Sequence, residues 1–286
     1  VVLAKNVLGP RKVKPFPKEI DGVKLDYIGH TAMEPNPPRI PLASELPNTP
    51  WQIHNRKIAC GSSVTAAPVY GAGTMGALVQ APDGMLCGLT NNHVTGDCNH
   101  TQQGMHILSP APVDAAPHGP APFAVGRHAS FISLQSGDPQ QTRLQEVDAA
   151  MFRIENPDAV TSMQGNGAYD TPTSVAEPHG GMRVKKVGRS TGLTRGTVRG
   201  FFGTPFALPY KSDKFSSLVY FNQPWGIQGD NGEPFCLAGD SGSLVVTEDE
   251  GSAVGLIFAA SDQLAAMIPL QKVLDQLDVT LVGGHV

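Results

Sequence analysis

From Ile58 onwards, short apolar runs alternate with glycine, proline and other turn-forming residues. Runs of this length, bounded by turn residues, are typical of β-strands. In the first half the pattern predicts strands over residues 74–80, 85–90, 123–125, 128–134 and 147–154. In the second half it predicts strands over residues 182–187, 194–202, 217–223, 243–247, 253–258 and 264–268.

One helix is predicted, close to the end of the chain, over residues 269–277. Proline is favoured in the first turn of a helix, where Pro269 stands, and the apolar residues that follow fall on one helical face. These residues are Leu270, Val273, Leu274 and Leu277.

The first 57 residues follow a different pattern. Pro37-Pro38, Pro41, Pro47 and Pro50 prevent a regular helix, whereas Val23, Leu25 and Tyr27 alternate as in a short strand. We expect an extension that lies along the body of the protein. It is either a regulatory or docking arm or simply a packing strap.

The composition agrees with an all-β fold. The chain has 286 residues, of which 40% are hydrophobic, so it can bury a sizeable core in one domain or two small ones. Its 32 glycines and 25 prolines favour short strands over long helices. A Gly/Pro-rich stretch over residues 157–181 separates the two halves and is interpreted as a linker.

The stretch Leu237 to Val246 contains a candidate nucleophile, Ser241. The small residues predict a tight turn, and the apolar residues after them predict a strand. Such a turn would present the hydroxyl group of Ser241 in front of the strand. Glycines on both sides allow a sharp bend, and the amides of Gly239 and Ser241 could converge on a developing oxyanion. The simpler alternative is that Ser241 is only a turn residue.

A serine needs a base, and the best-placed histidine is His93, just after the predicted strand 85–90. Asp148, a lone carboxylate at an apolar strand, could orient that imidazole. Each could instead be structural. His93, Cys98 and His100 could also suggest a metal site, but no second ligand pair has a suitable spacing, so no metal is expected.

Five short motifs follow one another along the chain. They are Gly71-Ala72-Gly73-Thr74-Met75-Gly76, Thr90-Asn91-Asn92-His93-Val94, Val147-Asp148-Ala149-Ala150, Val187-Gly188-Arg189-Ser190-Thr191-Gly192 and Gly239-Asp240-Ser241-Gly242-Ser243. Together they resemble trypsin-like (chymotrypsin-fold) serine peptidases, both the bacterial DegP/HtrA type and the trypsin-like peptidases related to the plant narrow-leaf protein.

The resemblance implies two six-stranded antiparallel β-barrels with a C-terminal helix that caps the second one. The expected organisation is an N-terminal extension over residues 1–57, a first barrel over 58–156, the linker over 157–181, and a second barrel with the helix over 182–286. His93 and Asp148 would come from the first barrel and Ser241 from the second. The implied activity is that of a serine endopeptidase, which acts on a protein or peptide and needs no cofactor.

The resemblance also suggests a substrate pocket. The residue six positions before the serine is Phe235, and the pocket-wall strand corresponds to Phe258-Ala259-Ala260. Because none of these residues is a carboxylate, we expect a small or medium apolar residue before the cleaved bond. If Arg or Lys were preferred instead, Asp230 or Glu233 would be the candidates to bind it.

Two further expectations concern charged residues. Asp240 is expected to have a structural hydrogen-bonding role, since Val1 lies too far from the first barrel strand for a zymogen-style insertion. The basic residues around the 187–192 motif are interpreted as a solvated face, with an anion or partner site as the alternative. These residues are Lys185, Lys186, Arg189, Arg195 and Arg199.

The net charge of −4 does not favour nucleic acid or an acidic membrane surface as a partner. No apolar run is long enough to span a membrane, and no signal segment is visible. Secreted trypsins resemble one another in having a cysteine directly after the catalytic histidine, whereas this chain has Val94 at that position. Free thiols and a cytoplasmic location are therefore favoured, and a leader that has been removed stays an alternative. The pairing of Cys60, Cys87, Cys98 and Cys236 and the oligomeric state are not determined by the sequence.

Two alternatives to a peptidase stay open. The chain could be a noncatalytic or autoinhibited trypsin-fold binding module, with the Pro-rich extension blocking the cleft. It could also be an esterase that uses the same triad, because peptidases and esterases share acyl-transfer chemistry.

Overall fold

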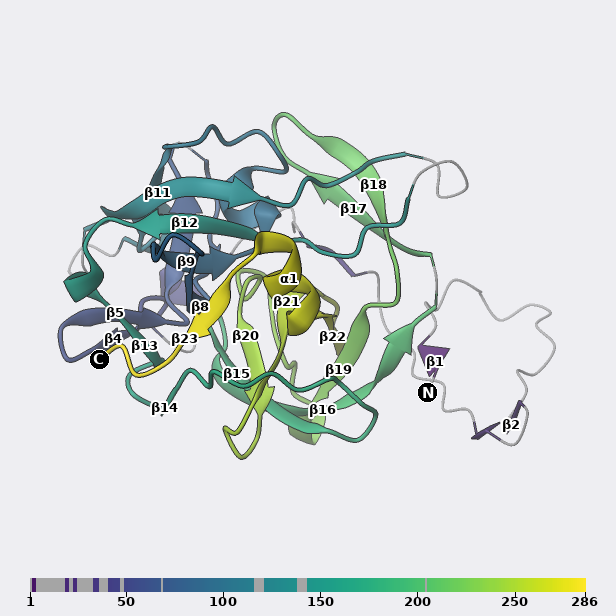
Figure 1. The fold of residues 1–286 in the computed structure, drawn as a ribbon. Helices are drawn as coiled ribbons and strands as arrows, with labels where there is room; N and C mark the ends of the chain where they lie inside the picture. The colour runs from purple at the N-terminus through teal and green to yellow at the C-terminus, as the bar shows by residue number, and fades with distance from the viewer. Residues whose placement is uncertain are drawn as a thin grey trace.

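A computed structural model gives the architecture, which is mostly β (Figure 1). The structure describes residues 2–3, 19–20, 23–24, 33–35, 41–46, 49–67, 69–115, 121–137, 143–203 and 205–286. Among these residues there is one α-helix, and no helix is long and apolar enough to cross a membrane. The short non-α helices are η1 (Ala43–Glu45), η2 (Asn92–Gly96, a π-turn), η3 (Pro112–Asp114), η4 (Pro157–Ala159) and η5 (Asp230–Gly232).

The second half forms a closed barrel, as predicted. Its strands are β15 (Arg183–Gly188), β16 (Gly192–Phe202), β19 (Trp225–Gly229), β20 (Leu244–Thr247), β21 (Ala253–Ala260) and β22 (Leu264–Pro269). They pair in the order β16-β15-β20-β21-β22-β19, and β19 returns to β16 and closes the ring. The short strand β1 (Val2–Leu3) adds to β16 in parallel.

The first half is a curved, open sheet, because its two end strands do not pair with each other. The order is β23-β8-β9-β12-β11-β10-β6-β7. The strands are β6 (Ser63–Ala66), β7 (Gly73–Thr74), β8 (Ala77–Gln80), β9 (Leu86–Thr90), β10 (His106–Ser109), β11 (Phe123–Phe131), β12 (Ala150–Ile154) and β23 (Thr280–Val282). This half therefore differs from a closed six-stranded barrel, although the chymotrypsin-like all-β architecture is the predicted one.

Between β7 and β8 the chain passes directly against the second half. A β-carbon on Gly76 would lie 2.0 Å from the carbonyl oxygen of Gly242. Only glycine allows two backbones to approach so closely. This close approach places the first half against the loop that carries Ser241.

A small four-stranded sheet lies beside the first half. Its order is β14-β13-β5-β4, with β4 (Ile53–His54), β5 (Lys57–Cys60), β13 (Val160–Gln164) and β14 (Tyr169–Asp170). The predicted linker therefore contains two strands, β13, which pairs with β5, and β14, which pairs with β13. Among the described residues before β4, the N-terminal extension forms strands only at β1 and at the pair β2 (Glu19–Ile20) and β3 (Val23–Lys24). Leu25 and Tyr27, which were expected to continue a strand from Val23, lie outside the described residues.

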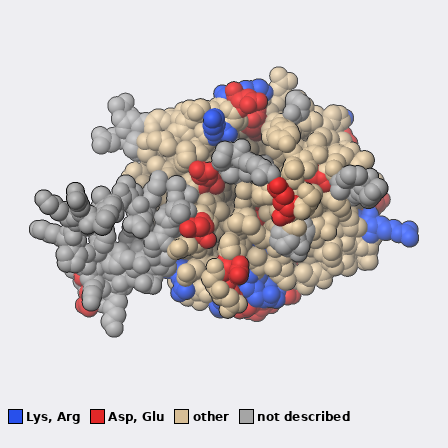
Figure 2. Space-filling model, turned by 180° about the vertical axis from the view of Figure 1, so that it is seen from behind, with Lys and Arg blue, Asp and Glu red and all other residues tan. Residues whose placement is uncertain are grey.

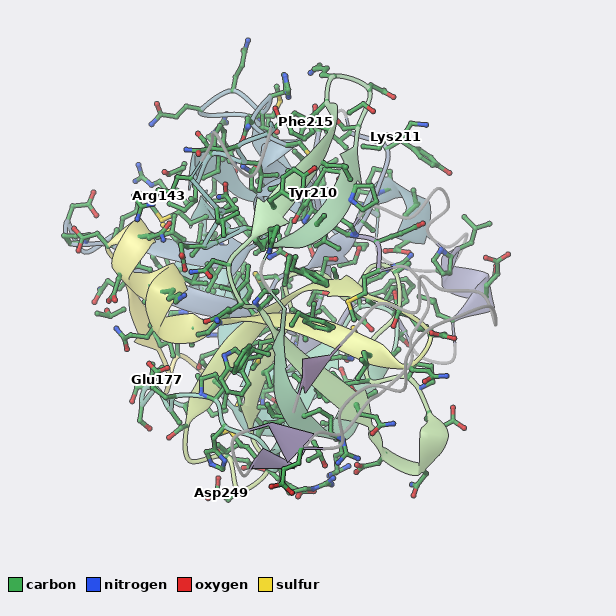
Figure 3. All side chains as sticks on the ribbon, turned by 90° about the vertical axis from the view of Figure 1, so that its right-hand side faces the viewer. Arg143, Glu177, Tyr210, Lys211, Phe215 and Asp249 are labelled. Carbon is green, nitrogen blue, oxygen red and sulfur yellow. The ribbon has the colours of Figure 1, made fainter. Side chains whose placement is uncertain are left out.

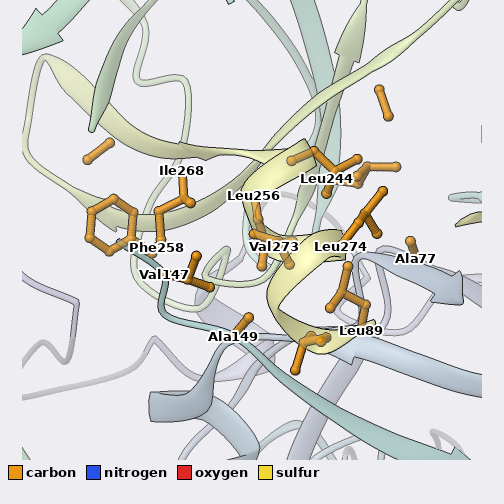
Figure 4. Close-up of a cluster of buried hydrophobic side chains, with 14 of the residues drawn as sticks. Ala77, Leu89, Val147, Ala149, Leu244, Leu256, Phe258, Ile268, Val273 and Leu274 are labelled. Atoms are coloured by element: carbon orange, nitrogen blue, oxygen red, sulfur yellow. The ribbon is translucent and has the colours of Figure 1, made fainter. Parts of the chain in front are cut away.

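The helix α1 (Leu270–Leu277) packs against β21 and β22 and buries the apolar face predicted from the sequence. The chain then crosses back to the first half, where β23 pairs with β8. Figure 4 shows part of a core that both halves share, in which Leu89 and Ala149 of the first half lie with Leu244 and Leu256 of the barrel beside Val273 of the helix. The two halves are joined by a common hydrophobic cluster.

A β-hairpin stands apart from both halves. It consists of β17 (Phe206–Lys211) and β18 (Ser216–Phe221), which pair only with each other as strands. Figure 1 shows the hairpin reaching from the barrel to the side of the first half that carries β11. On the opposite face of the molecule, basic and acidic side chains are interspersed over an uncharged surface (Figure 2).

Candidate active site

Asp148 is fully buried just before β12, and its carboxylate receives four hydrogen bonds. Oδ1 accepts from the backbone amides of Asn92 at 2.8 Å and His93 at 3.3 Å. Oδ2 accepts from Nδ1 of His93 at 2.6 Å and from the hydroxyl of Tyr210 at 2.8 Å. A buried carboxylate is stable only when such donors replace its water shell.

His93 lies in the π-turn η2, directly after β9. The side chain of Asn91 donates to the backbone carbonyl of Asp148 at 2.7 Å and ties this turn to β12. Because Nδ1 donates to Asp148, the neutral ring carries its lone pair on Nε2. Nε2 is buried and has no hydrogen-bond partner among the described residues. His93 is therefore a base whose proton-accepting atom is unoccupied.

Ser241 lies on the seam between the two halves and is 9% exposed. Its carbonyl accepts a hydrogen bond from the amide of Thr74 at 2.8 Å, and the hydroxyl of Thr90 donates to the carbonyl of Thr74 at 2.8 Å. Thr90 ends β9, three residues before His93. The structure thus brings the serine loop to the strand end that leads to His93, without a described hydrogen bond between Ser241 and His93.

The turn around Ser241 requires glycine at two positions. Gly239 and Gly242 have φ angles of +95° and +94°, which L-residues with side chains rarely adopt. A β-carbon on Gly239 would also lie 2.6 Å from Oγ of Ser190. Within the described part of the chain, the amides of Gly239 and Ser241 donate to no acceptor. They are available to bind an anionic oxygen.

Asp240 has the structural hydrogen-bonding role expected from the sequence. Its Oδ1 accepts from the amide of Ser190 at 2.7 Å, and its Oδ2 accepts from the amide of Leu237 at 2.9 Å and the hydroxyl of Thr191 at 2.8 Å. The ammonium of Lys186 is 3.4 Å from Oδ2, and both side chains are fully buried. The loop before Ser241 is therefore held from within the barrel, by the β15–β16 turn.

The interpretation of the basic residues as a solvated face is wrong for three of them. Lys185, Lys186 and Arg189 are buried. Arg189 forms an ion pair with Asp114, which comes from the first half and is also fully buried. The acidic partners lie far away in the sequence, which is why the basic run by itself looks like a surface feature.

The residues expected to form the substrate pocket are mostly packed in cores. Phe235 belongs to the hydrophobic interior of the barrel, and Phe258 lies 4.8 Å from the ring of Phe221. Ala259 is buried, whereas Ala260 at the end of β21 is partly exposed. Of the two alternative carboxylates, Asp230 forms a bidentate ion pair with Arg183 at 2.6 Å.

All four cysteines are unpaired and buried. Burial raises the pKa of the Cys60 thiol to about 12 and that of Cys87 to about 11, so both stay protonated at neutral pH. Among the described residues, no group of three His, Cys, Asp or Glu side chains is arranged to hold a metal ion.

Comparison with known proteins places this geometry in context. Thermobifida fusca Protease A has a similar structure, with a TM-score of 0.52 and 18% identity, covering 79% of this chain and 100% of its own. The chain has the chymotrypsin fold.

Sequence comparison agrees with the narrow-leaf resemblance. Residues 170–277 match the family model of the Nal1 C-terminal domain. Protein NARROW LEAF 1 of Oryza sativa subsp. japonica is 26% identical over 311 residues, which cover 92% of this chain and 48% of that protein. The chain therefore spans about half the length of this relative.

One residue of this chymotrypsin-fold site was missed by the sequence reasoning. Tyr210, on the hairpin β17–β18, contacts both Asp148 and His93. A signal was present, since Phe206, Leu208 and Tyr210 alternate with polar or small residues before a turn. Pro209 in the middle of the run weakens that signal.

Proposed function

We propose that this chain is a serine endopeptidase. Ser241 attacks the peptide carbonyl, His93 takes up the proton and returns it to the leaving amine, and Asp148 orients the imidazole and stabilises its cation. The amides of Gly239 and Ser241 hold the oxyanion, and each such donor contributes roughly 2.7 to 4 kcal/mol in measured enzymes. The observation that carries the proposal is the 2.6 Å hydrogen bond from His93 to Asp148, which leaves Nε2 of His93 available.

The substrate class follows from the fold and the site together. The chain shares the chymotrypsin fold with Thermobifida fusca Protease A, and this likeness supports a protein or peptide substrate. A small or medium apolar residue before the cleaved bond is the expectation from the sequence alone, because Phe235, Phe258 and Ala259 are packed in cores and only Ala260 is partly exposed. A peptide-library profile dominated by Arg or Lys would contradict this specificity.

The first prediction concerns Ser241. A fluorophosphonate probe should label the wild type, and labelling should disappear in Ser241→Ala and His93→Ala, because the probe reacts with an activated serine. Ser252→Ala, in the turn between β20 and β21, is the matched control and should label like the wild type. Undiminished labelling of Ser241→Ala would contradict the proposal.

A second candidate, an autoinhibited module, is favoured by a contact of the N-terminal extension. β21 runs beside the serine loop, since the amide of Ile257 donates to the carbonyl of Ser243. Further along β21, Glu34 pairs antiparallel with Ala260 through two hydrogen bonds of 3.1 and 3.5 Å. Met33 is buried in the core shared by both halves.

An extended peptide substrate would bind by adding a strand to a sheet edge of this kind. β21 lies between β20 and β22, but its last residues extend past its pairing with β20, and there Ala260 pairs with the chain's own residue 34. Segment 33–35 therefore occupies the place where the main chain of a substrate would pair.

The second prediction separates the two candidates. Deleting residues 1–40 should raise the rate of fluorophosphonate labelling and peptide hydrolysis, because the edge of β21 becomes open. Deleting only residues 1–18 keeps segment 33–35 and serves as the control, with rates like those of the full chain. Equal rates for all three proteins, each with an intact melting transition, would eliminate the autoinhibited module.

A further inference from the structure

The hairpin β17–β18 brings one tyrosine into the site from outside both halves. The burial pattern of β17 alternates, so that Leu208 and Tyr210 face inward. Figure 3 labels Tyr210 on this hairpin and Phe215 close to its tip. Tyr210 is 1% exposed although its strand belongs to neither main sheet.

Tyr210 and His93 bind the same carboxylate oxygen. The hydroxyl of Tyr210 donates to Oδ2 of Asp148 at 2.8 Å, and Nδ1 of His93 binds that atom at 2.6 Å. The rings of Tyr210 and His93 meet edge to face, with centroids 5.7 Å apart. Burial and the nearby charge of Asp148 raise the pKa of Tyr210 well above its ordinary value, so its hydroxyl stays protonated and can only donate to the carboxylate.

The hairpin is fastened to the segment that carries Asp148. The amide of Gln145 donates to the carbonyl of Tyr220 at 2.7 Å, and the amide of Asn222 donates to the carbonyl of Gln145 at 3.0 Å. Gln145 is three residues before Asp148. The hydrogen bond of Tyr210 is therefore supported by backbone contacts on the neighbouring strand.

The tip of the hairpin contacts the turn that carries His93. Nζ of Lys214 lies 3.4 Å from Oδ2 of Asp97, and the rings of Phe215 and His100 are 6.3 Å apart. Asp97 follows the π-turn of His93 directly. One hairpin thus contacts the base, its orienting carboxylate and both segments that hold them.

We propose that Tyr210 is a positioning residue of the His93–Asp148 pair. The inference rests on the proposed function for its kinetic consequences. The hydroxyl of Tyr210 fixes the rotation of the Asp148 carboxylate and takes up part of the negative charge on Oδ2. Without it, the carboxylate would rotate more freely and would stabilise the protonated form of His93 more strongly. The third titratable group near Asp148 is Cys98, whose pKa burial raises, so its thiol stays neutral.

The third prediction is the kinetic effect of Tyr210→Phe. This change removes one oxygen and keeps the ring in place. Loss of a hydrogen bond to a charged group should lower kcat about tenfold. KM should be unchanged, since Tyr210 is buried and its hydroxyl binds Asp148. The acidic limb of kcat/KM should move to higher pH, because protonated His93 becomes more stable.

The matched control is Tyr220→Phe, which removes a tyrosine hydroxyl from the other strand of the same hairpin. Its kcat, pH profile and melting temperature should equal those of the wild type. If Tyr210→Phe kept the wild-type kcat and acidic limb, the proposal would be overturned. A fall in kcat that is accompanied by lower thermal stability but no shift of the acidic limb would also overturn it, because the role would then be structural.

A spectroscopic measurement tests the inference independently of turnover. The proton between Nδ1 of His93 and Asp148 should give a low-field proton NMR signal, which Tyr210→Phe should shift and Tyr220→Phe should not. An unshifted signal in Tyr210→Phe would overturn the proposal. Peptide hydrolysis that survives in Ser241→Ala would instead refute the proposed peptidase function, and the NMR result would still decide the role of Tyr210.

Discussion

Two buried ion pairs surround the turn that carries Ser241. Lys186 binds Asp240 from within the barrel, and Arg189 binds Asp114 across the seam between the halves. Arg189 also donates to the hydroxyl of Ser190 at 3.1 Å, next to Gly239. Buried charges are stable only when they are paired, so each pair fixes the backbone that carries its partner. The serine turn is therefore held in place by buried charges.

The fourth prediction concerns Lys186→Met, which leaves the Asp240 carboxylate buried without its cation. Removal of one partner from a buried pair destabilises proteins by about 3 to 5 kcal/mol. Urea unfolding should show a loss of this size, and probe labelling of Ser241 should fall as the turn loosens.

Lys185→Met is the matched control for this experiment. Lys185 is the neighbouring residue, and its partner Glu250 is 46% exposed. Water can solvate Glu250 after the substitution, so the loss should be clearly smaller. Similar losses in both variants would show that the Lys186–Asp240 pair has no special role.

At the scale of elements, the helix α1 and the strand β23 connect the two halves. Leu274 of α1 lies in the core that includes Leu89 of β9 and Leu244 of β20. After the helix, Leu281 of β23 pairs with Val79 of β8. A C-terminal segment of the second half thus completes the edge of the first sheet.

The fifth prediction tests this connection. Leu274→Ala should destabilise the protein by about 2 to 5 kcal/mol, because it leaves a cavity in the shared core. Gln271→Ala, on the exposed face of the same helix, should change the free energy of unfolding by less than about 0.5 kcal/mol. Hydrogen exchange should show lower protection in β8 and β9 as well as in the barrel for Leu274→Ala. Loss of protection in the barrel alone would contradict the shared core.

The strands that the sequence predicted and those that it missed differ in which residues they bury. The barrel strands β20, β21 and β22 match the predicted runs because their residues are almost all apolar, and β15 and β16 match because glycine-containing turns bound them. β13 was missed because it buries polar residues, of which Gln164 donates to the carbonyl of Gly76 at 2.8 Å. The separate strands expected over 123–125 and 128–134 are joined in one strand, β11, in which a β-carbon on Gly126 would lie 2.2 Å from the carbonyl oxygen of Arg153.

At the scale of the whole molecule, the proposed site is assembled at a seam. His93 and Asp148 lie in segments next to strands of the open sheet, Ser241 in the loop before β20 of the closed barrel, and Tyr210 on a separate hairpin. The extension adds segment 33–35 at the edge of β21. Activity would therefore depend on the relative placement of four parts, which the shared core under α1 and the Arg189–Asp114 pair hold together.

The sequence by itself determined the all-β class, the amphipathic helix and the nomination of His93, Asp148 and Ser241. These depend on local order, because strand and helix periodicity and short glycine-containing turns are encoded within a few neighbouring residues. Only the tertiary structure decided that Lys186 and Arg189 are buried, that Tyr210 binds Asp148, and that Glu34 pairs with Ala260. Each of these contacts joins residues far apart in the chain, and whether a charge or a hydroxyl is buried depends on which distant partner the fold brings to it.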